Sequence, residues 1–350
     1  MGKRPVLAVT MGDAAGIGAE IVVKALKREE IYNHCIPVVV GDYEAIADAV
    51  SFTYSPMSVK RILSPEDAKG VPGTVEMIDL GLLPRRGWEY KKVDSITGNA
   101  SYQYIVKAIR LALDNRVHAV VTGPINKEAM NAAGHHFAGH TEIFAYHTKA
   151  KSYAMLLMSE ALKVMHCTTH VSMREACDRI TYERVHEVIC LADEAMRLMG
   201  GKEPKIGVAG LNAHCSENGL FGTEEEISII PAIEQAKREG YQVEGPVPPD
   251  TVFVKAMAKQ YDIVVAMYHD QGHIPVKLTG FKLNLETKKY ESISGVNVTV
   301  GLPVIRTSVD HGTAFDKAGE GRANEESMVE AIELAALMAK HKFPEFMEEI

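Results

Sequence analysis

The segment VVAMYHDQGHIPVK, residues 264–277, changes within a few positions from apolar residues to a dense set of polar ones. Its first residues continue the apolar run DIVVA, which is typical of a strand buried on both faces. Two imidazoles, a carboxylate and an amine follow within a short stretch. A loop that only had to turn would use Gly, Asn or Ser, so this density of ionisable groups indicates a functional site.

Similar apolar runs alternate with helical segments along the rest of the chain. The other runs are VLAVTMGD (6–13), IPVVVGD (36–42), HAVVTGP (118–124) and KIGVAGLNAH (205–214). Helical periodicity is found at 100–114, 181–200, 223–240 and 324–341. Thr223 and Asn324 are the expected N-caps of the last two helices. The alternation predicts an α/β fold with largely parallel sheets and helices on both faces, in one unit of two interdigitated subdomains spanning residues 1–350.

Composition limits the classes of function. The chain has 350 residues, 46% of them hydrophobic, and a formal net charge of −8, which argues against general nucleic-acid binding. Its five cysteines are scattered without a C-x-x-C pair, which argues against a zinc–thiolate site or a disulfide framework and favours a reducing cytoplasm. No apolar run of about 18 residues occurs, so no transmembrane helix is expected.

In open α/β sheets, ligands bind beyond the carboxyl ends of the strands, so polar clusters after strand runs are the candidate sites. The first cluster is the turn MGDAAGIGAEI, residues 11–21. It is neither a G-x-G-x-x-G motif nor a Walker A motif. It either presents backbone N–H groups to an anion or is only a tight turn that needs small residues.

Histidines form the second candidate site. His170, His214 and His269 each follow a strand run, so parallel strands would place them side by side. Three neutral imidazoles with an open fourth position are a pattern of catalytic divalent metal sites. Each of them alone is more often a solvated residue. Asp270 would either orient His269 or only form a turn.

Two further clusters carry cationic side chains. Lys127 follows a strand and is either a proton-transfer residue, a carboxylate anchor or a solvated lysine. The segment GHTE is a candidate helix cap, with Thr141 opening the helix after it. Arg306 lies in an apolar strand, where it would bind a phosphate or carboxylate or pair with Asp310. The small-residue loop 311–321 is long enough to wrap around a cofactor.

These motifs together resemble one family. The matching segments, collinear from residue 11 to about residue 324, are MGDAAGIGAEI, TGPINKEAM, GHTE, TTHVSM, GLNAHCSENGLFGTEE, PPDT, YHDQGHIPVK and GVNVTVGLPVIRTSVDHGTAFDKAG. The series resembles the 4-hydroxythreonine-4-phosphate dehydrogenase family. The resemblance implies a fold similar to that of isocitrate and isopropylmalate dehydrogenases, with the site in the cleft between the two subdomains.

The resemblance also implies an activity and a set of site residues. The activity is NAD-dependent oxidation of a secondary alcohol β to a carboxylate, followed by decarboxylation, with a divalent cation (Zn, Mn, Mg or Co) at the interface of a homodimer. The implied metal ligands are His170, His214 and His269. The implied substrate contacts are His140, Thr141, Lys277, Asn297 and Arg306. The cofactor side is similar at Gly12, Asp13, Gly16, His311, Gly312 and Thr313. The candidates for catalytic proton transfer are Lys127 and Asp250, and Asp250 is alternatively a helix N-cap.

The chain departs from the biosynthetic members in several places. Ala213 precedes His214, CSENGLFG follows it, Asn126 precedes Lys127, and residues 278–295 form a charged insertion expected to be a hairpin or loop. These features resemble the D-threonate and D-erythronate 4-phosphate dehydrogenase branch, whose product would be dihydroxyacetone phosphate. The alternatives are the dehydrogenase of pyridoxal phosphate biosynthesis, an aromatic cis-dihydrodiol dehydrogenase, and a non-catalytic ligand-binding homologue.

Overall fold

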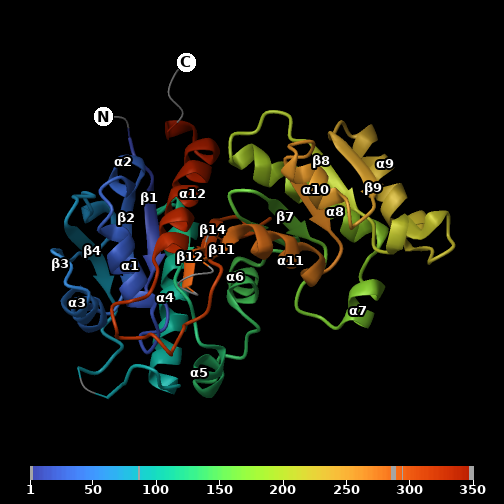
Figure 1. Ribbon diagram of the computed structural model, residues 1–350. Helices are drawn as coiled ribbons and strands as arrows, with labels where there is room; N and C mark the ends of the chain where they lie inside the picture. Colours follow the sequence, from blue (N-terminus) through green and yellow to red (C-terminus); the bar gives the residue numbers. More distant parts are fainter. Residues whose placement is uncertain (1–2, 86, 285–288, 294, 347–350) are drawn as a thin grey trace. The chain divides into compact units, whose positions relative to one another are not determined.

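The computed structural model describes residues 3–85, 87–284, 289–293 and 295–346 (Figure 1). The chain divides into two compact α/β units. The first unit combines both ends of the chain, Met1–Lys151 and Leu302–Ile350, and the second is Ser152–Gly301. No helix in the described part of the chain has the length and apolar character needed to cross a membrane.

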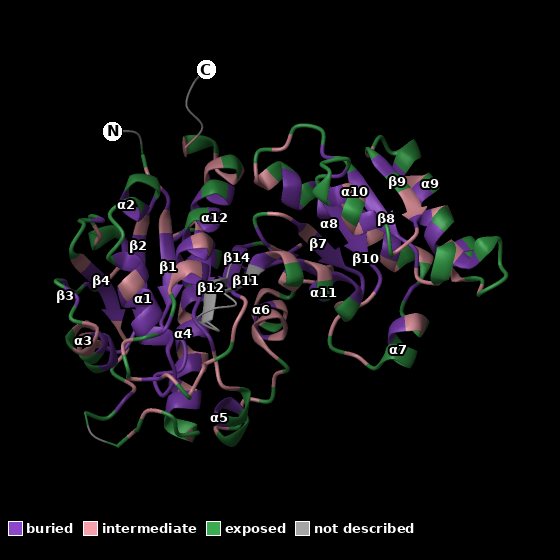
Figure 2. Ribbon diagram, viewed as in Figure 1, coloured by how far each residue is buried: buried purple, intermediate pink, exposed green. Residues whose placement is uncertain are grey.

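The first unit contains a parallel sheet. In spatial order its strands are β3 (Ser58–Arg61), β4 (Thr74–Asp79), β2 (Ile36–Gly41), β1 (Val6–Thr10), β5 (Ala119–Thr122) and β14 (Ile305–Val309). Each neighbouring pair among them is parallel. Every residue of β5 and β14 is buried, as expected for strands covered on both faces. Figure 2 shows β1 and β2 of the same sheet largely buried as well.

The helical segments of the first unit connect these strands. They are α1 (Gly18–Leu26), α2 (Ile31–His34), α3 (Tyr43–Phe52), η1 (Pro65–Asp67), α4 (Ser95–Leu113), α5 (Lys127–Ala132), α6 (His140–Thr148), α12 (Glu326–Lys342) and η4 (Pro344–Phe346). The C-terminal helix α12 packs against β14 and β5, so the end of the chain completes the core of its N-terminal unit.

The second unit has a mixed sheet. In spatial order its strands are β13 (Val296–Val300), β6 (Ala154–Met158), β7 (Lys163–His166), β10 (Ile263–Ala266), β8 (Ile206–Ala209) and β9 (Val243–Val247). The pairs β13–β6 and β6–β7 are antiparallel, and the remaining pairs are parallel. The carboxyl ends of β7, β10 and β8 therefore lie at the same edge of this sheet.

The remaining segments of the second unit are mostly helical. They are α7 (Met173–Asp178), α8 (Tyr182–Leu198), η2 (Ala213–Glu217), η3 (Glu225–Ile229), α9 (Ile230–Arg238), α10 (Val252–Met257) and α11 (His269–Gly280). A separate antiparallel hairpin is made of β11 (Phe281–Asn284) and β12 (Lys289–Ile293).

The predicted α/β class with largely parallel strands is confirmed, and the expected hairpin lies within the insertion 278–295. The prediction of Thr223 as a helix cap was wrong, because the segment begins with the π-helical turn η3 after Glu224, without a side-chain cap. The prediction of Asn324 as the N-cap of α12 was also wrong, because that position belongs to Glu325; Asn324 lies one residue earlier, where its side chain accepts from the backbone N–H of Glu326 at 2.8 Å. The closer likeness to isocitrate dehydrogenase and the cleft site stay predictions.

Candidate functional site

The glycine-rich turn after β1 is fixed by close backbone approaches. Gly12 has a φ of +76°, and a Cβ there would lie 2.4 Å from the carbonyl oxygen of Pro124. A Cβ on Gly16 would lie 2.8 Å from Thr313. The N–H of Asp13 donates to Pro124 at 2.9 Å. The two glycines are therefore required by packing, and four of the predicted cofactor residues, Gly12, Asp13, Gly16 and Thr313, are brought together here.

Asp13 is a completely buried carboxyl group in this turn. Burial raises its pKa to about 6, and the hydrogen bond from the backbone N–H of Ala15 to Oδ1 works against that rise. Its other oxygen, Oδ2, accepts no hydrogen bond from the described residues. A buried acceptor without a partner is costly, so the turn offers a position for a hydroxyl or amide donor of a ligand.

A cavity of about 170 Å³ lies beside the turns that follow β5 and β14. It is lined by Thr122, Pro124, Ile125, Lys127, Gly139, His140, Ser308, Val309, His311 and Gly312. Lys127 is the first residue of α5, where the side chain of Asn126 accepts from Ala129 at 2.9 Å and caps the helix. The cavity thus joins Lys127 and His140 to His311 and Gly312 of the predicted cofactor loop.

Arg306 is the second residue of β14, and its side chain enters this region. It is only 3% exposed, and its Nη2 donates to the hydroxyl of Thr122 at 2.9 Å. Burial lowers its pKa to about 9, and the charge of Glu142 opposes that shift. The guanidinium remains protonated at neutral pH. A buried planar cation beside a hydroxyl-lined cavity is suited to a carboxylate or phosphate.

Two imidazoles line the same cavity. The Nε2 atoms of His140 and His311 are buried and make no hydrogen bond with the described residues. Burial, and then the charge of Arg306, hold the pKa of His140 well below its ordinary value. Burial also lowers the pKa of His311. Both rings are therefore neutral at neutral pH, and each has a buried nitrogen available to a ligand.

The histidines of the second unit form a stack at the start of α11. The rings of His269 and His273 are stacked with centroids 3.6 Å apart, and His170 lies 5.7 Å from His269 by the same measure. Nδ1 of His269 is 2.6 Å from Oδ1 of Asp270, a contact that leaves Nε2 as the ligand atom. Asp270 therefore orients the imidazole, as one of the two sequence interpretations predicted.

Other polar residues of this segment are structural. Gln271 accepts from the N–H of Met267 at 2.7 Å and donates to the carbonyl of Gly210 at 2.8 Å, which ties the end of β10 to the end of β8. A Cβ on Gly272 would lie 2.3 Å from the buried ring of His166. The dense polar segment at 264–277 thus combines a scaffold with a candidate metal ligand.

His214 lies in an unusual loop after β8. Residues 214–218 all have positive φ values between 46° and 60°, although none is glycine. The buried carboxylate of Glu225 holds the loop: it accepts from the N–H groups of Leu211 and Asn212 at 2.8 and 2.7 Å and from the hydroxyl of Ser216. Strain stabilised by one buried carboxylate is typical of a functional loop.

Within one chain, the three predicted metal ligands do not form a closed cluster. Among the described residues, a different group of side chains meets the distance expected for a metal site. Its ligand atoms, from His186, Cys190 and Glu239, all lie within 4.8 Å of one another. His170 and His269 are neighbours, whereas the described geometry does not bring His214 into such a group with them.

The remaining predicted residues are placed as follows. Lys277 lies in α11 and Asn297 in β13, each partly exposed, and Oδ1 of Asn297 is buried without a hydrogen bond to described residues. Thr141 lies in the first turn of α6, whose N-cap is Gly139, so it does not open the helix. Asp250 is exposed and is not the N-cap of α10, because that position belongs to Thr251.

Thr122 is a site residue that the sequence analysis missed. It is the last residue of β5, and the run HAVVTGP contained it without any feature that marked it as functional. Its role follows from the pairing of β5 with β14, which aligns Thr122 with Ser308, two residues from Arg306. The sequence analysis also gave no role to His166 and His273. Their position in the histidine cluster depends on how the two rings are buried in the fold and not on any spacing of residues in the sequence.

Comparison with known proteins agrees with the family resemblance. Residues 33–335 match the model of the family described as pyridoxal phosphate biosynthetic protein PdxA. D-threonate 4-phosphate dehydrogenase of Cupriavidus necator is 44% identical over 339 residues, 97% of this chain and 98% of that protein. The protein of the same name from Salmonella typhimurium is 45% identical over 334 residues, 95% of this chain and 98% of that protein.

A solved structure shows the same fold. The crystal structure of 4-hydroxythreonine-4-phosphate dehydrogenase from Klebsiella pneumoniae has a TM-score of 0.85 and 42% identity, and the match covers 97% of this chain and 99% of that one. The predicted family and enzyme class are confirmed by these matches. The chain therefore belongs to the PdxA family and is a dehydrogenase.

Proposed function

We propose that this dehydrogenase oxidises and decarboxylates a 4-phosphorylated 3-hydroxy acid. The substrate is 4-phospho-D-threonate or 4-phospho-D-erythronate, and the products are dihydroxyacetone phosphate, CO₂ and NADH. The observation that carries the proposal is the nearly full-length likeness to two proteins named D-threonate 4-phosphate dehydrogenase, at 44% and 45% identity. Oxidation at C3 gives a β-keto acid, which loses its C1 carboxylate as CO₂.

The cavity of the first unit supports an anionic substrate. Arg306 is a buried cation, and His140 and His311, which line the cavity, each have a buried nitrogen that makes no hydrogen bond with the described residues. We assign the phosphate or carboxylate to Arg306 and His140, together with the predicted contacts Thr141, Lys277 and Asn297. Because His140 is neutral, it donates or accepts a hydrogen bond without adding a second charge.

The glycine-rich turn and the loop after β14 are suited to a dinucleotide. Asp13 offers an unpartnered buried oxygen, and Thr313 packs directly against Gly16. We assign NAD to Gly12, Asp13, Gly16, His311, Gly312 and Thr313. When bound, NAD accepts the hydride from C3 of the substrate.

The histidines of the second unit fit a divalent cation (Zn, Mn, Mg or Co). His269 is oriented by Asp270 and lies next to His170. We propose that His170 and His269 of one subunit and His214 of a second subunit complete the site in a homodimer. When bound, the cation supplies Lewis-acid chemistry, since it lowers the pKa of a coordinated hydroxyl and polarises a carbonyl.

Lys127 is the preferred proton-transfer residue. It lines the cavity with His140 and is held at the start of α5 by the Asn126 cap. Asp250 is the second candidate; it lies in the loop before α10 in the other unit. The substitutions Lys127→Met and Asp250→Asn remove the two ionisable groups one at a time and so distinguish the two candidates. The substitution that removes the proton-transfer residue should abolish turnover while substrate affinity is retained.

A second candidate substrate is 4-phosphooxy-L-threonine. The observation in its favour is the 42% identity to the Klebsiella pneumoniae structure, which is named 4-hydroxythreonine-4-phosphate dehydrogenase. The two reactions share phosphate and carboxylate contacts and differ at C2, where a hydroxyl replaces an amine.

NADH formation distinguishes the candidates. The purified protein is given NAD, a divalent cation and, in parallel, 4-phospho-D-threonate, 4-phospho-D-erythronate or 4-phosphooxy-L-threonine. We expect kcat/KM to favour one of the hydroxy acids. A preference for the amino acid would replace the proposal by the second candidate, and no NADH with any of the three would contradict both.

A further inference from the structure

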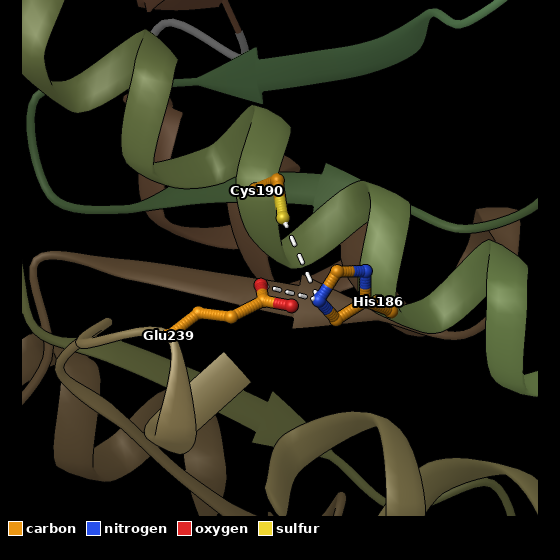
Figure 3. A group of neighbouring side chains, drawn as sticks. All are labelled: His186, Cys190 and Glu239. Carbon is orange, nitrogen blue, oxygen red and sulfur yellow. Dashed lines mark hydrogen bonds and ion pairs between the residues drawn. The ribbon is translucent and has the colours of Figure 1, made fainter. Parts of the chain in front are cut away.

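A cluster of three different ligand types lies away from the proposed catalytic residues. His186 and Cys190 are on α8, and Glu239 follows α9 (Figure 3). Nε2 of His186 is 2.7 Å from Oε2 of Glu239 and 4.0 Å from Sγ of Cys190. All three ligand atoms lie within 4.8 Å of one another, and both partners converge on the same imidazole nitrogen in Figure 3.

The distances are close to those of a zinc site. Bond lengths of about 2.3 Å to sulfur and about 2.0 Å to nitrogen in a tetrahedral site separate these atoms by roughly 3.6 Å. For nitrogen and a carboxylate oxygen the separation is roughly 3.4 Å. The sulfur is thus slightly too far from Nε2 and the carboxylate slightly too near. A bound ion would replace the direct contact between His186 and Glu239, with Oε2 moving away from Nε2 and Sγ moving toward it.

The backbone holds the cluster in place. His186 and Cys190 are four residues apart on one helix, so their side chains lie on the same face, one turn apart. Glu239 is the residue directly after the last turn of α9, and α8 and α9 are in contact. The His186 and Glu239 side chains are 23% and 36% exposed, which leaves the site open to an ion and to a water ligand.

The three side chains supply a set of ligand atoms that suits zinc-like ions, one imidazole nitrogen, one thiol sulfur and one carboxylate oxygen. A divalent cation bound by His186 and Glu239 would displace the thiol proton, because coordination stabilises the thiolate.

We propose that His186, Cys190 and Glu239 form a second metal site of this protein, which binds a zinc-like divalent transition ion. Water occupies the fourth position. The lack of C-x-x-C pairs argues against sites built from paired thiolates, whereas this site has a single sulfur. Bound metal joins α8 to the end of α9, so it stabilises the second unit rather than taking part in the dehydrogenase reaction.

The test uses Co²⁺ as a spectroscopic probe of the full-length protein. Sulfur ligation of Co²⁺ produces an intense charge-transfer band in the near ultraviolet, which a site made of histidines alone does not produce. Titration of the metal-free wild type is compared with Cys190→Ser and His186→Ala. Cys177→Ser and Cys215→Ser are the matched thiol controls, since both cysteines are also partly exposed. Far-ultraviolet circular dichroism verifies that each variant is folded.

We expect the band in the wild type, Cys177→Ser and Cys215→Ser, and its loss in Cys190→Ser. Glu239→Gln should weaken Co²⁺ binding at the sulfur-containing site by about tenfold or more, whereas Glu234→Gln, an exposed control on α9, should not. Zn²⁺ should raise the thermal midpoint of the wild type more than that of Cys190→Ser. Absence of the band in the wild type, or its persistence in folded Cys190→Ser, would overturn the proposal.

Discussion

The guanidinium of Arg306 donates to the hydroxyl of Thr122 across 2.9 Å, with both side chains buried in the first unit. The parallel pairing of β14 with β5 creates this contact, because it places Ser308 beside Thr122 at the ends of the two strands. The hydroxyl holds one edge of the planar cation and thereby sets its orientation beside the cavity.

Arg306→Lys should raise KM for the phosphorylated substrate by about 10- to 100-fold, with a much smaller effect on kcat. Lysine keeps the charge but lacks the bidentate fork that binds a phosphate or carboxylate. Steady-state kinetics of NADH formation measure the two constants, and the exposed Arg110→Lys is the control. A fall in kcat at unchanged KM would contradict the role of Arg306 as a ground-state anchor.

Asp13→Asn should remove a pH dependence of stability. The folded-state pKa of about 6 is above the ordinary value of 3.8 for this carboxyl group, so the stability contribution of Asp13 is full below about pH 4 and is lost as the pH rises through about 6. Ionisation of the buried group costs about 3 kcal/mol at neutral pH. The variant cannot ionise, so its free energy of unfolding relative to wild type should increase across this range.

Urea unfolding of the ligand-free protein, measured between about pH 4 and about pH 7, checks this expectation. The exposed Asp114→Asn serves as the control for a carboxylate without burial. If the free energy of unfolding changes with pH in parallel for the wild type and Asp13→Asn, the carboxyl group of Asp13 is not the source of the pH dependence of stability.

Glu225→Gln should disturb the loop that carries His214. A glutamine amide group places a donor where the carboxylate now accepts from Asn212 and Ser216. We expect the affinity for the divalent cation to fall by about 10- to 100-fold, with kcat reduced in proportion at fixed cation concentration. Since Glu225 acts through His214 as a positioning residue, excess cation should restore part of the activity.

Cation titrations monitored by activity and by direct binding test this role. The exposed neighbour Glu226→Gln has the same charge change and should bind the cation as the wild type does. If Glu225→Gln lowers only the thermal midpoint and leaves cation affinity unchanged, Glu225 has a structural role alone.

His214→Ala should abolish turnover and weaken binding of the catalytic cation, because it removes one of the three proposed ligands. The exposed His34→Ala is the control. Binding at the proposed second site should continue, so the sulfur charge-transfer band with Co²⁺ separates the two sites. Activity of His214→Ala with its cation still bound would rule out the three-histidine site.

The segment at 264–277 shows how far the sequence could be interpreted. Its apolar start predicted β10, and its position after a strand predicted a site that includes His269. The sequence selected His269 as the residue that follows the strand, but it assigned no role to His273 or Gln271. The structure does: burial lowers the pKa of His273 to about 4, and the amide of Gln271 bonds to two backbone groups, the N–H of Met267 and the carbonyl of Gly210.

By itself, the sequence determined the α/β class with its alternation of strands and helices, the family, and several strand ends where polar residues gather. These properties depend on local periodicity and on motifs that are contiguous in the chain. Only the tertiary structure decided that Arg306 meets Thr122, and that Glu239 meets a histidine 53 residues away. Such contacts depend on strand register and on how helices pack, and both result from burial of apolar surface summed over the whole unit rather than from any short stretch of residues.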